Sequence, residues 1–388
     1  MWNVWLLKPG ELTLKGENRK SFEGILKSNL QRLMAKIENR IKIKFTMGRY
    51  YIEAPQEKSE EVENVLSRLI GISGWAKTFS CEKTKEAVFS ACVELGKNLY
   101  KSGVKTFKIN ARRTDKSFPL TSYELCCLAA NEITAETCEL KVDIHNPDDV
   151  INIEIREKAF VYSSGKKGIG GLPVGCAGRG MLLLSGGIDS PVAGFLMACR
   201  GMTIDAVHFH AYPYTSIESK QKVIRLAETT SLYCMGINLY ILNFTQVQMK
   251  IKKNAPEEWV TVLLRMAMME AALKAAQKTK CKCLITGESL SQVASQTIEN
   301  LSCTQNRISL PVLRPLIGFN KEAIIKEAKR IGTFNTSIEP HQDCCTLFVP
   351  PHPVLRGNVA EANKLYEALE LEVLIEEALQ GYELVKCN

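Results

Sequence analysis

The stretch MLLLSGGIDSPVAGFLMACRG, residues 181–201, decides the fold of the C-terminal half of the chain. An apolar run ends at the letters SGG, the letters IDS follow, and a second apolar run begins at Pro191. This order predicts a strand, a glycine turn and a helix, which is an arrangement that proteins use to hold phosphate groups. The start of such a helix offers unpaired N–H groups and the positive end of the helix dipole.

The polar residues of the glycine turn (residues 185–190) predict individual contacts. Hydroxyls and closely approaching backbone amides come from Ser185, Gly186, Gly187 and Ser190. Pro191 suits the first helical position, with Ser190 or Asp189 as the N-cap. Because a carboxylate repels phosphate, Asp189 predicts either a ligand of the Mg²⁺ that accompanies ATP or a helix cap.

Three other phosphate or nucleophile turns do not match this stretch. No Gly-Lys-Ser/Thr closes it, so it is not a Walker loop. The glycine spacing is wrong for a dinucleotide fingerprint. A nucleophile elbow needs Gly-x-Ser-x-Gly, and that pattern is missing from the turn.

Strands and helices alternate through the rest of the C-terminal segment. We expect strands at 181–184, 206–210, 239–244, 283–287 and about 309–312, and helices at about 191–200, 217–230, 257–278, 293–303 and 320–331, followed by a helical tail. This alternation predicts an α/β fold with a doubly wound parallel sheet. Ligands of such sheets bind at the carboxyl ends of the strands, and the first βα turn is the favoured place.

Two smaller α+β segments precede this sheet. Residues 1–73 predict a ferredoxin-like domain, with strands at 2–7, 41–46 and 50–53 and helices at 19–37 and 59–70. Residues 74–165 predict a second domain, with helices at 85–101 and 122–133 and strands at 106–113, 141–145 and 150–157. Residues 163–180 hold seven glycines, so we place a linker at 166–180 and the C-terminal domain at 181–388.

Charge is distributed unevenly along the 388 residues, which carry a net charge of +8. Residues 1–50 hold eleven Lys or Arg against four Asp or Glu, and residues 97–116 hold seven against one. From Cys176 onward the counts are 22 and 20. A basic N-terminal half on a balanced C-terminal half predicts a polyanion-binding module joined to a catalytic domain.

Composition also predicts the compartment. No run of about 18 apolar residues is present, so no membrane span is expected. The N-terminus MWNVWLLKPG lacks a basic n-region and a cleavage site, and the 14 cysteines are scattered, so we expect a cytoplasmic protein with reduced thiols. Most cysteines, including the pair Cys126-Cys127, are expected to be buried in packing.

The sequence SGGIDS resembles the pyrophosphate-binding loop (PP-loop) of ATP pyrophosphatases, which split ATP into AMP and pyrophosphate. Longer sequence motifs are similar to those of the tRNA 4-thiouridine synthetases, and they occur in the same order over essentially the whole chain. They are GELTLKGENRKSF, TFKINARRTDKSFP, GGLPVG, LLLSGGIDSPVAG and DCCTLFVPPHP. The resemblance implies that residues 74–165 form a THUMP tRNA-binding domain and that 181–388 form the pyrophosphatase domain.

The resemblance implies an ATP and Mg²⁺ site. Its nucleotide-binding residues are Leu183, Leu184, Ser185, Gly186, Gly187, Asp189, Ser190, His208, Phe209, Arg265, Gly287 and Gln296. From the sequence, His208 and Phe209 stand where the second strand ends. Arg265 lies in the apolar helix WVTVLLRMAMMEAALKAA, where its charge needs either a phosphate or a structural ion-pair partner.

The resemblance places the catalytic cysteine at Cys344, beside Cys345, with Asp189 as the second catalytic residue. Cys344 falls in a proline-rich polar stretch, where a thiol is more available than in a helix. A metal site with His341 and His352 is the alternative, but adjacent cysteines are poorly spaced for tetrahedral ligation. The pair Cys281-x-Cys283 is one residue short of the Cys-x-x-Cys of cluster-dependent relatives.

The implied partners are tRNA and a sulfur donor. RNA contacts are expected from Lys8, Lys15, Arg19, Lys108, Arg112, Arg113 and Lys116. The sequence ends at Asn388, so we expect no rhodanese domain and direct sulfur delivery from a cysteine desulfurase or another donor. The resemblance also implies a homodimer and a role in sulfur transfer for the thiamine thiazole.

The expected reaction is adenylation of a tRNA uridine, at position 8 by resemblance, followed by transfer of persulfide sulfur from Cys344 to give 4-thiouridine. Two alternatives stay open. One is another ATP pyrophosphatase, such as a 2-thiouridylase or an amide-forming synthetase. The other is a non-catalytic RNA-binding protein that keeps an inactive loop.

Overall fold

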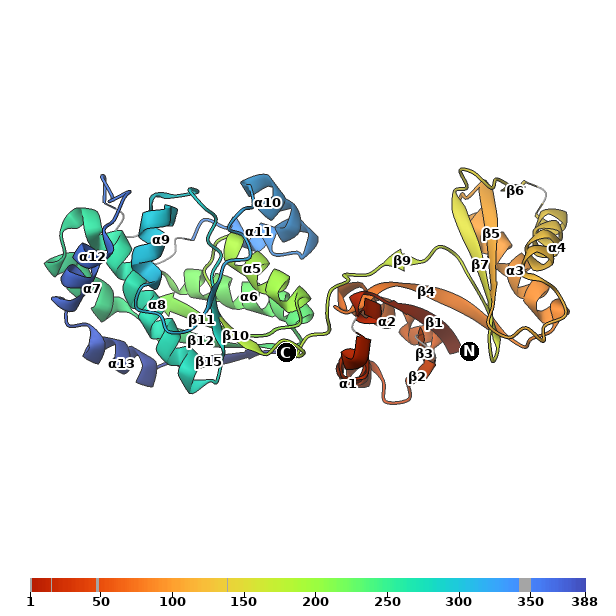
Figure 1. The fold of residues 1–388 in the computed structure, drawn as a ribbon, viewed down its shortest axis with the longest axis horizontal. Coiled ribbons are helices and arrows are strands. Elements are labelled where there is room, and N and C mark those ends of the chain that lie inside the picture. Colours follow the sequence, from red (N-terminus) through yellow and green to blue (C-terminus); the bar gives the residue numbers. More distant parts are fainter. Residues whose placement is uncertain (1, 15, 47–48, 138, 342–349) are drawn as a thin grey trace. The chain divides into compact units, whose positions relative to one another are not determined.

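Figure 1 shows the computed structural model, which describes residues 2–14, 16–46, 49–137, 139–341 and 350–388. The chain divides into two compact units, residues 1–171 and 172–388, and each is described by itself. Within the described ranges, no helix is both long enough and apolar enough to cross a membrane.

The first unit is built on one twisted sheet with helices packed against it. Its strands are β1 (Trp2–Pro9), β2 (Lys42–Thr46), β3 (Arg49–Pro55), β4 (Ile72–Cys81), β5 (Thr106–Arg113), β6 (Lys141–Val142), β7 (Asp149–Ile155), β8 (Ala159–Tyr162) and β9 (Lys166–Lys167). Its α-helices are α1 (Arg19–Ile37), α2 (Ser59–Arg68), α3 (Lys85–Lys101) and α4 (Ser122–Glu136), with 3-10 turns at Glu11–Leu14, Gly16–Asn18 and Gln56–Lys58.

Strand β4 joins the two halves of this unit. The strand order is β2-β3-β1-β4-β8-β7-β5-β6, and β9 also pairs with β4. The first part of β4 pairs with β1, for example Trp75 with Leu7, and its end pairs with β8. The strand therefore runs through the boundary that we placed between residues 73 and 74. Each half keeps a separate core, one under α1 and α2 and one under α3 and α4.

The second unit is a doubly wound sheet, as predicted. Its strands are β10 (Arg179–Leu183), β11 (Thr203–His210), β12 (Ile237–Asn243), β13 (Cys283–Ile285), β14 (Val312–Leu313) and β15 (Glu383–Cys387). Its α-helices are α5 (Asp189–Cys199), α6 (Ile217–Cys234), α7 (Thr245–Asn254), α8 (Val260–Lys278), α9 (Ile298–Gln305), α10 (Lys321–Arg330), α11 (Phe334–Ser337), α12 (Val359–Glu367) and α13 (Glu372–Gln380), with 3-10 turns at Glu257–Trp259 and Ala294–Gln296.

Alternation of side chains along β10 shows how both faces are covered. Met181 belongs to the core beneath α8, whereas the neighbouring Leu182 faces α5, where it lies 2.8 Å from the position of a β-carbon on Gly194. Neighbouring residues of a strand point to opposite faces, so a continuous apolar run is what a strand buried on both sides needs.

Several predicted elements differ from the structure. The predicted helical tail is wrong at its end, because β15 follows α13 and pairs antiparallel with β12. The predicted helix at 293–303 begins only at Ile298, because the Thr297 hydroxyl caps it by accepting the Asn300 N–H. The predicted strand at 141–145 stops at Val142, because the Asp143 carboxylate accepts the His145 and Asn146 N–H groups and turns the chain.

Candidate active site

The candidate site lies where the strand order of the second unit reverses. The sheet runs β14-β13-β10-β11-β12-β15, so the chain moves from β10 outward to β12 and then returns to β13 on the other side of β10. In open α/β sheets the crevice at such a switch point, beyond the carboxyl ends of the strands, is where ligands bind. The glycine turn leaves β10 at this place.

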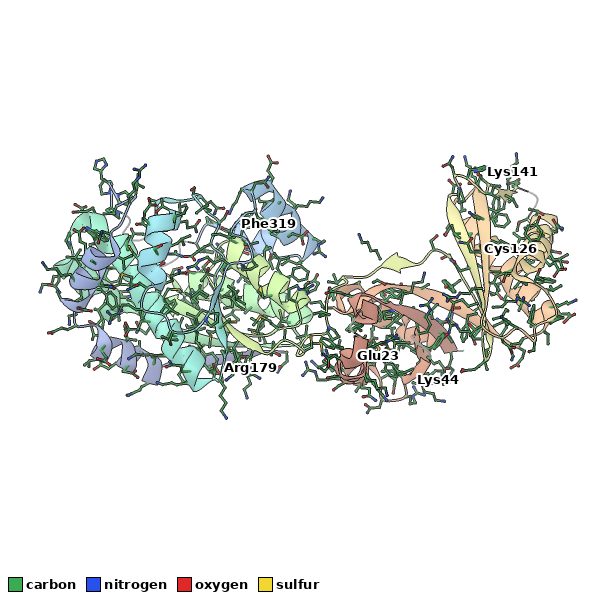
Figure 2. All side chains as sticks on the ribbon, in the orientation of Figure 1. Glu23, Lys44, Cys126, Lys141, Arg179 and Phe319 are labelled. Atoms are coloured by element: carbon green, nitrogen blue, oxygen red, sulfur yellow. The ribbon has the colours of Figure 1, made fainter. Side chains whose placement is uncertain are left out.

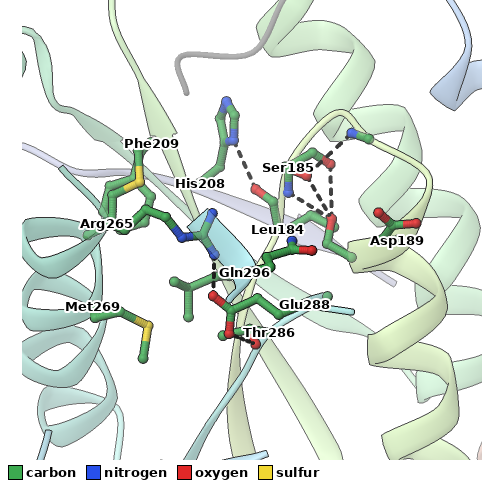
Figure 3. A pocket seen from close by; sticks show the side chains of 15 residues that line it. Leu184, Ser185, Asp189, His208, Phe209, Arg265, Met269, Thr286, Glu288 and Gln296 are labelled. Atoms are coloured by element: carbon green, nitrogen blue, oxygen red, sulfur yellow. Dashed lines mark hydrogen bonds and ion pairs between the residues drawn. The ribbon is translucent and has the colours of Figure 1, made fainter. Parts of the chain in front are cut away.

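One pocket opens at this edge, with about 800 Å³ of space when its opening to solvent is included. Its lining comprises Leu183, Leu184, Ser185, Gly187, Asp189, Ser190, His208, Phe209, Arg265, Met268, Met269, Thr286, Gly287, Glu288 and Gln296 (Figure 3). Every predicted nucleotide residue except Gly186 is therefore in this lining.

Two serine hydroxyls hold the glycine turn in shape. The Ser185 N–H donates to the Ser190 hydroxyl at 2.9 Å, and the two hydroxyl oxygens lie 3.1 Å apart. The Gly187 N–H reaches the Ser185 hydroxyl at 3.3 Å. These bonds close the turn back on the first residue of the sequence SGG, so its own serine side chains hold its backbone.

Asp189 does not cap the helix, so the predicted N-cap is wrong. Helix α5 begins at Asp189 itself, with Ile188 at the N-cap and no side-chain capping bond. One carboxylate oxygen of Asp189 accepts the Gln292 amide at 2.9 Å, and the other pairs with the Lys321 ammonium at 2.6 Å. Ser190 is turned back to Ser185 instead. Sequence reasoning missed Lys321, and this ion pair brings a cation to the glycine turn.

Gly287 brings the end of β13 against the start of α5. A β-carbon at Gly287 would lie 2.7 Å from the Ser190 nitrogen and 2.9 Å from two more backbone atoms of Asp189 and Ser190. Glycine is thus required by a close approach of two backbones. The nearby Gln296 is 7% exposed, and its buried Oε1 has no hydrogen-bond partner among the described residues, which suits a site that receives a ligand donor.

Arg265 has the structural ion pair that the sequence left open. Its guanidinium pairs with buried Glu288, which also accepts the Arg314 Nε at 2.7 Å and the Thr286 hydroxyl at 2.8 Å. Burial opposes ionisation of Glu288, but the charges and hydrogen bonds of the two arginines outweigh it and hold the pKa of this carboxyl below its usual value. Two arginines share one carboxylate, so this cluster presents a net positive charge at the pocket wall.

His208 and Phe209 occupy the end of β11. The Nδ1 atom of His208 lies 3.0 Å from the Leu184 carbonyl oxygen, and because a carbonyl only accepts, Nδ1 carries the proton. This bond joins the second strand to the start of the glycine turn. Phe209 packs on Phe244, with ring centroids 4.8 Å apart, and thereby gives the pocket an apolar wall.

The predicted sulfur carrier Cys344 and its neighbour Cys345 lie outside the described residues. The pair Cys281 and Cys283 is buried, and burial raises the pKa of each thiol to about 11, so neither is a ready thiolate. In the pair on α4, Cys126 (Figure 2) packs partly against the core, but Cys127 is exposed. The expectation that both are buried is therefore wrong, because the buried stripe of α4 is Leu125, Ala129 and Ile133.

The predicted RNA residues fall on the first unit, and Lys15 lies outside the described residues. Lys8 on β1 covers the Tyr162 ring, and burial followed by the Arg49 charge lowers its pKa. Arg19 pairs with Glu23 on the first turn of α1. On and after β5, Arg112 and Lys116 are exposed and Lys108 is half-buried. Arg113 points to the other face and donates to the Phe118 carbonyl at 3.0 Å, which anchors the turn after β5.

A doubly wound sheet with its pocket at a serine-tied glycine turn defines the class of this unit, a PP-loop α/β domain. Residues 175–371 match the family described as Thiamine biosynthesis protein (ThiI). Residues 4–76 match the ThiI ferredoxin-like domain, and residues 82–164 match the THUMP domain. The chain belongs to the ThiI family.

Relatives extend over nearly the whole chain. A probable tRNA sulfurtransferase of Treponema pallidum is 46% identical and covers 97% of this chain and 94% of its own. A probable tRNA sulfurtransferase of Caldanaerobacter subterraneus is 42% identical, and the match covers 97% of this chain and 98% of that protein. A crystal structure of a 4-thiouridine synthetase–RNA complex with bound ATP is similar over 100% of both chains, with a TM-score of 0.93 and 34% identity.

Proposed function

We propose that this protein is an ATP-dependent tRNA sulfurtransferase that converts a tRNA uridine, at position 8, into 4-thiouridine. The observation that carries the proposal is the pocket at the glycine turn, which gathers the predicted nucleotide residues from three separate strand ends. The similarity to a 4-thiouridine synthetase with ATP bound, over both full chains, supports the same ligand in this pocket.

In the first step, the C4 oxygen of the uridine attacks the α-phosphorus of ATP. The bond between the α-phosphorus and its bridging oxygen breaks, so pyrophosphate leaves and AMP stays on the base. The amides of the glycine turn and the start of α5 face the leaving group, and oriented N–H groups stabilise the charge that develops there. Lys321, held beside the turn by Asp189, supplies a further positive charge.

The remaining pocket residues orient the nucleotide. Leu183, Leu184 and Phe209 give an apolar wall for the adenine. Gln296 offers a ribose or base donor an amide oxygen that has no hydrogen-bond partner among the described residues. Arg265 is committed to Glu288, so its role is to hold the positive cluster in place. Of the two partners that the sequence left open for Arg265, a phosphate or a structural ion pair, the ion pair with Glu288 favours support of the pocket wall.

Mg²⁺ is proposed to enter with ATP, and the donor set fits that mode. Asp189 is the carboxylate of the turn, and its two oxygens already accept Lys321 and Gln292. Mg²⁺ usually keeps several waters and binds through one or two carboxylates together with substrate phosphates. Each of these oxygens keeps a further lone pair, so among the described residues Asp189 would be the carboxylate ligand of the ion, which would neutralise charge on the phosphates.

In the second step, a persulfide on Cys344 transfers sulfur. Its terminal sulfur forms a bond to C4, the bond from C4 to the adenylated oxygen breaks, and AMP leaves. The remaining disulfide between the base and Cys344 is cleaved by a second thiol, which supplies two electrons. The products are 4-thiouridine and a disulfide of Cys344 with that thiol, which a cellular dithiol reduces before a desulfurase or other donor reloads the cysteine.

RNA binding is proposed for the first unit, through Lys8, Lys15, Arg19, Lys108, Arg112, Arg113 and Lys116. Phosphate contacts of this kind fix the register of the RNA without reading its sequence. A cytoplasmic location, a homodimer and sulfur transfer for the thiamine thiazole remain predictions from the family resemblance.

The test is pyrophosphate release from ATP with and without tRNA. A tRNA sulfurtransferase releases pyrophosphate and AMP only when unmodified tRNA is present, and the tRNA then gains absorbance near the 4-thiouridine band. Release that depends on a free carboxylate and an amine donor would support an amide-forming synthetase instead. Thiolation at C2, seen by nucleoside mass spectrometry, would support a 2-thiouridylase.

A further inference from the structure

The segment that leads toward Cys344 is fastened to the glycine turn. Helix α11 and the residues after it span 334–341, and we call these residues the sulfur-loop stem. Within the stem, the Ser337 hydroxyl donates to the Gly187 carbonyl at 3.3 Å. One end of the stem is therefore attached to the turn that faces the leaving pyrophosphate.

Helix α6 holds the other end of the stem. The Lys222 ammonium donates to the Glu339 carbonyl at 2.9 Å and to the His341 carbonyl at 3.5 Å. One turn further along α6, the Arg225 guanidinium forms an ion pair with the Glu339 carboxylate. The His341 N–H also closes back on the Glu339 carbonyl at 2.8 Å, so the stem ends in a tight, fastened turn.

Lys222 is an unusual residue to find in this position. Its side chain is only 4% exposed, and within the described ranges no carboxylate lies at ion-pair distance from its ammonium. A buried charge without a paired opposite charge is costly, and lysine is almost never fully buried for packing alone. An apolar side chain of similar length fills the same space without that cost. Among the described residues, the charge serves its two carbonyl contacts.

We propose that Lys222 is a positioning residue for the sulfur-transfer step. It fixes the His341 carbonyl, from which three peptide steps along the sequence lead to Cys344, while Ser337 ties the same stem to the nucleotide turn. The inference rests on the proposed function. It adds that adenylation and sulfur transfer are separable, and that Lys222 supports only the second.

The experiment compares Lys222→Met with Lys220→Met. Lys220 lies on the same helix but is half-buried and pairs with Glu383 on β15 instead of with the stem, so it is the matched control. Two rates are measured on each full-length protein with unmodified tRNA. One is single-turnover pyrophosphate release without a sulfur donor, and the other is 4-thiouridine formation with a persulfide donor.

We expect Lys222→Met to release pyrophosphate within about twofold of wild type but to form 4-thiouridine about 10- to 100-fold more slowly, the loss that a misplacement of about 1 Å produces. Lys222→Arg, which keeps a charged donor, should recover part of the rate, and Lys220→Met should match wild type in both rates. Arg225→Met removes an exposed contact of the stem without threatening the fold, and it should show the same selective loss at smaller size.

Three results would overturn the inference. Lys222→Met could form 4-thiouridine as fast as wild type, or a folded Lys222→Met could lose both rates equally. If Lys222→Met does not fold, the third result is an Arg225→Met variant that shows no selective loss of 4-thiouridine formation. Failure of the proposed function looks different. In that case the wild-type protein itself would form no 4-thiouridine, whatever residue stands at position 222.

Discussion

Gly287→Ala should damage ATP binding through the backbone of the glycine turn. The new β-carbon would lie 2.7 Å from the Ser190 nitrogen and 2.9 Å from both the Asp189 carbonyl carbon and the Ser190 α-carbon. All three atoms belong to the backbone at the start of α5, so no flexible side chain can move aside. The φ angle at Gly287 lies outside the left-handed region, so the entire effect is steric.

The size of the effect follows from overpacking. Forcing one methyl group into a tightly packed place costs about 1–3 kcal/mol. Because a tenfold change in affinity corresponds to about 1.4 kcal/mol, we expect ATP to bind about 5- to 150-fold more weakly if the turn absorbs the displacement. Isothermal titration of ATP into the protein measures this directly, and a melting curve shows what part of the cost falls on folding.

Gly318→Ala is the matched control. It lies in the same unit, and a β-carbon there would meet nothing within 4 Å. It should bind ATP as wild type does. Wild-type ATP affinity and melting temperature in Gly287→Ala would refute the reasoning. The backbones of the strand end and the helix start would then have space for a β-carbon at position 287.

Three further outcomes follow from the contacts. Glu288→Gln leaves Arg265 and Arg314 without their shared carboxylate and should lower the free energy of unfolding by about 3–5 kcal/mol in urea titrations at pH 7. Because the folded pKa of Glu288 is held low, its contribution is complete above the unfolded value of about 4.3 and is lost as the pH falls through the folded pKa, so wild type and variant should converge in acid. Lys321→Met should slow tRNA-dependent pyrophosphate release about 10- to 150-fold, the value of a charged hydrogen bond, whereas Lys326→Met, at an exposed position of the same helix, should not. Equal rates in Lys321→Met and wild type would remove Lys321 from the site. Arg112→Ala should weaken tRNA binding and reduce the slope of log K against log salt by about 1, and an unchanged slope would mean that Arg112 meets no phosphate.

Local patterns predicted the parts of the site that are contiguous in sequence. The strand MLLL, the glycine turn and the following helix are neighbours along the chain, and the doubly wound fold then brings the ends of β11 and β13 to the same edge. For this reason His208 and Gly287 reach the pocket beside Ser185. The strand order alone places these residues at one edge of the sheet, so their proximity can be predicted without knowledge of side-chain packing.

Contacts between distant side chains were not predictable. Lys321 is 132 residues from Asp189 along the chain, and no local pattern links them. Glu288 follows a strand in the letters ITGES, and this local sequence does not predict that two arginines share its carboxylate. The helix start at Asp189 was misjudged because Ser190 and Asp189 are both capable caps. Ser190 instead bonds Ser185 within the turn, and Asp189 bonds the distant Gln292.

Strand β15 was not predicted from the sequence for a different reason. Its sequence ELVKC has a mostly exposed burial pattern because it lies at the sheet edge, beside β12. An edge strand of five residues carries little apolar alternation, so it cannot be told from a frayed helix end by periodicity. The pairing with β12 supplies what the sequence alone does not show.

The central claim is that Cys344 carries the sulfur that a nucleotide-activated tRNA receives. Wild type and Cys344→Ser are each incubated with unmodified tRNA, ATP, Mg²⁺ and a persulfide donor, and the digested nucleosides are analysed by mass spectrometry while pyrophosphate is counted. We expect wild type to form 4-thiouridine at position 8, and Cys344→Ser to release pyrophosphate but form none. Full 4-thiouridine formation by Cys344→Ser, with loss in Cys345→Ser, would move the sulfur carrier by one residue, and 4-thiouridine formation that survives both substitutions would contradict the account.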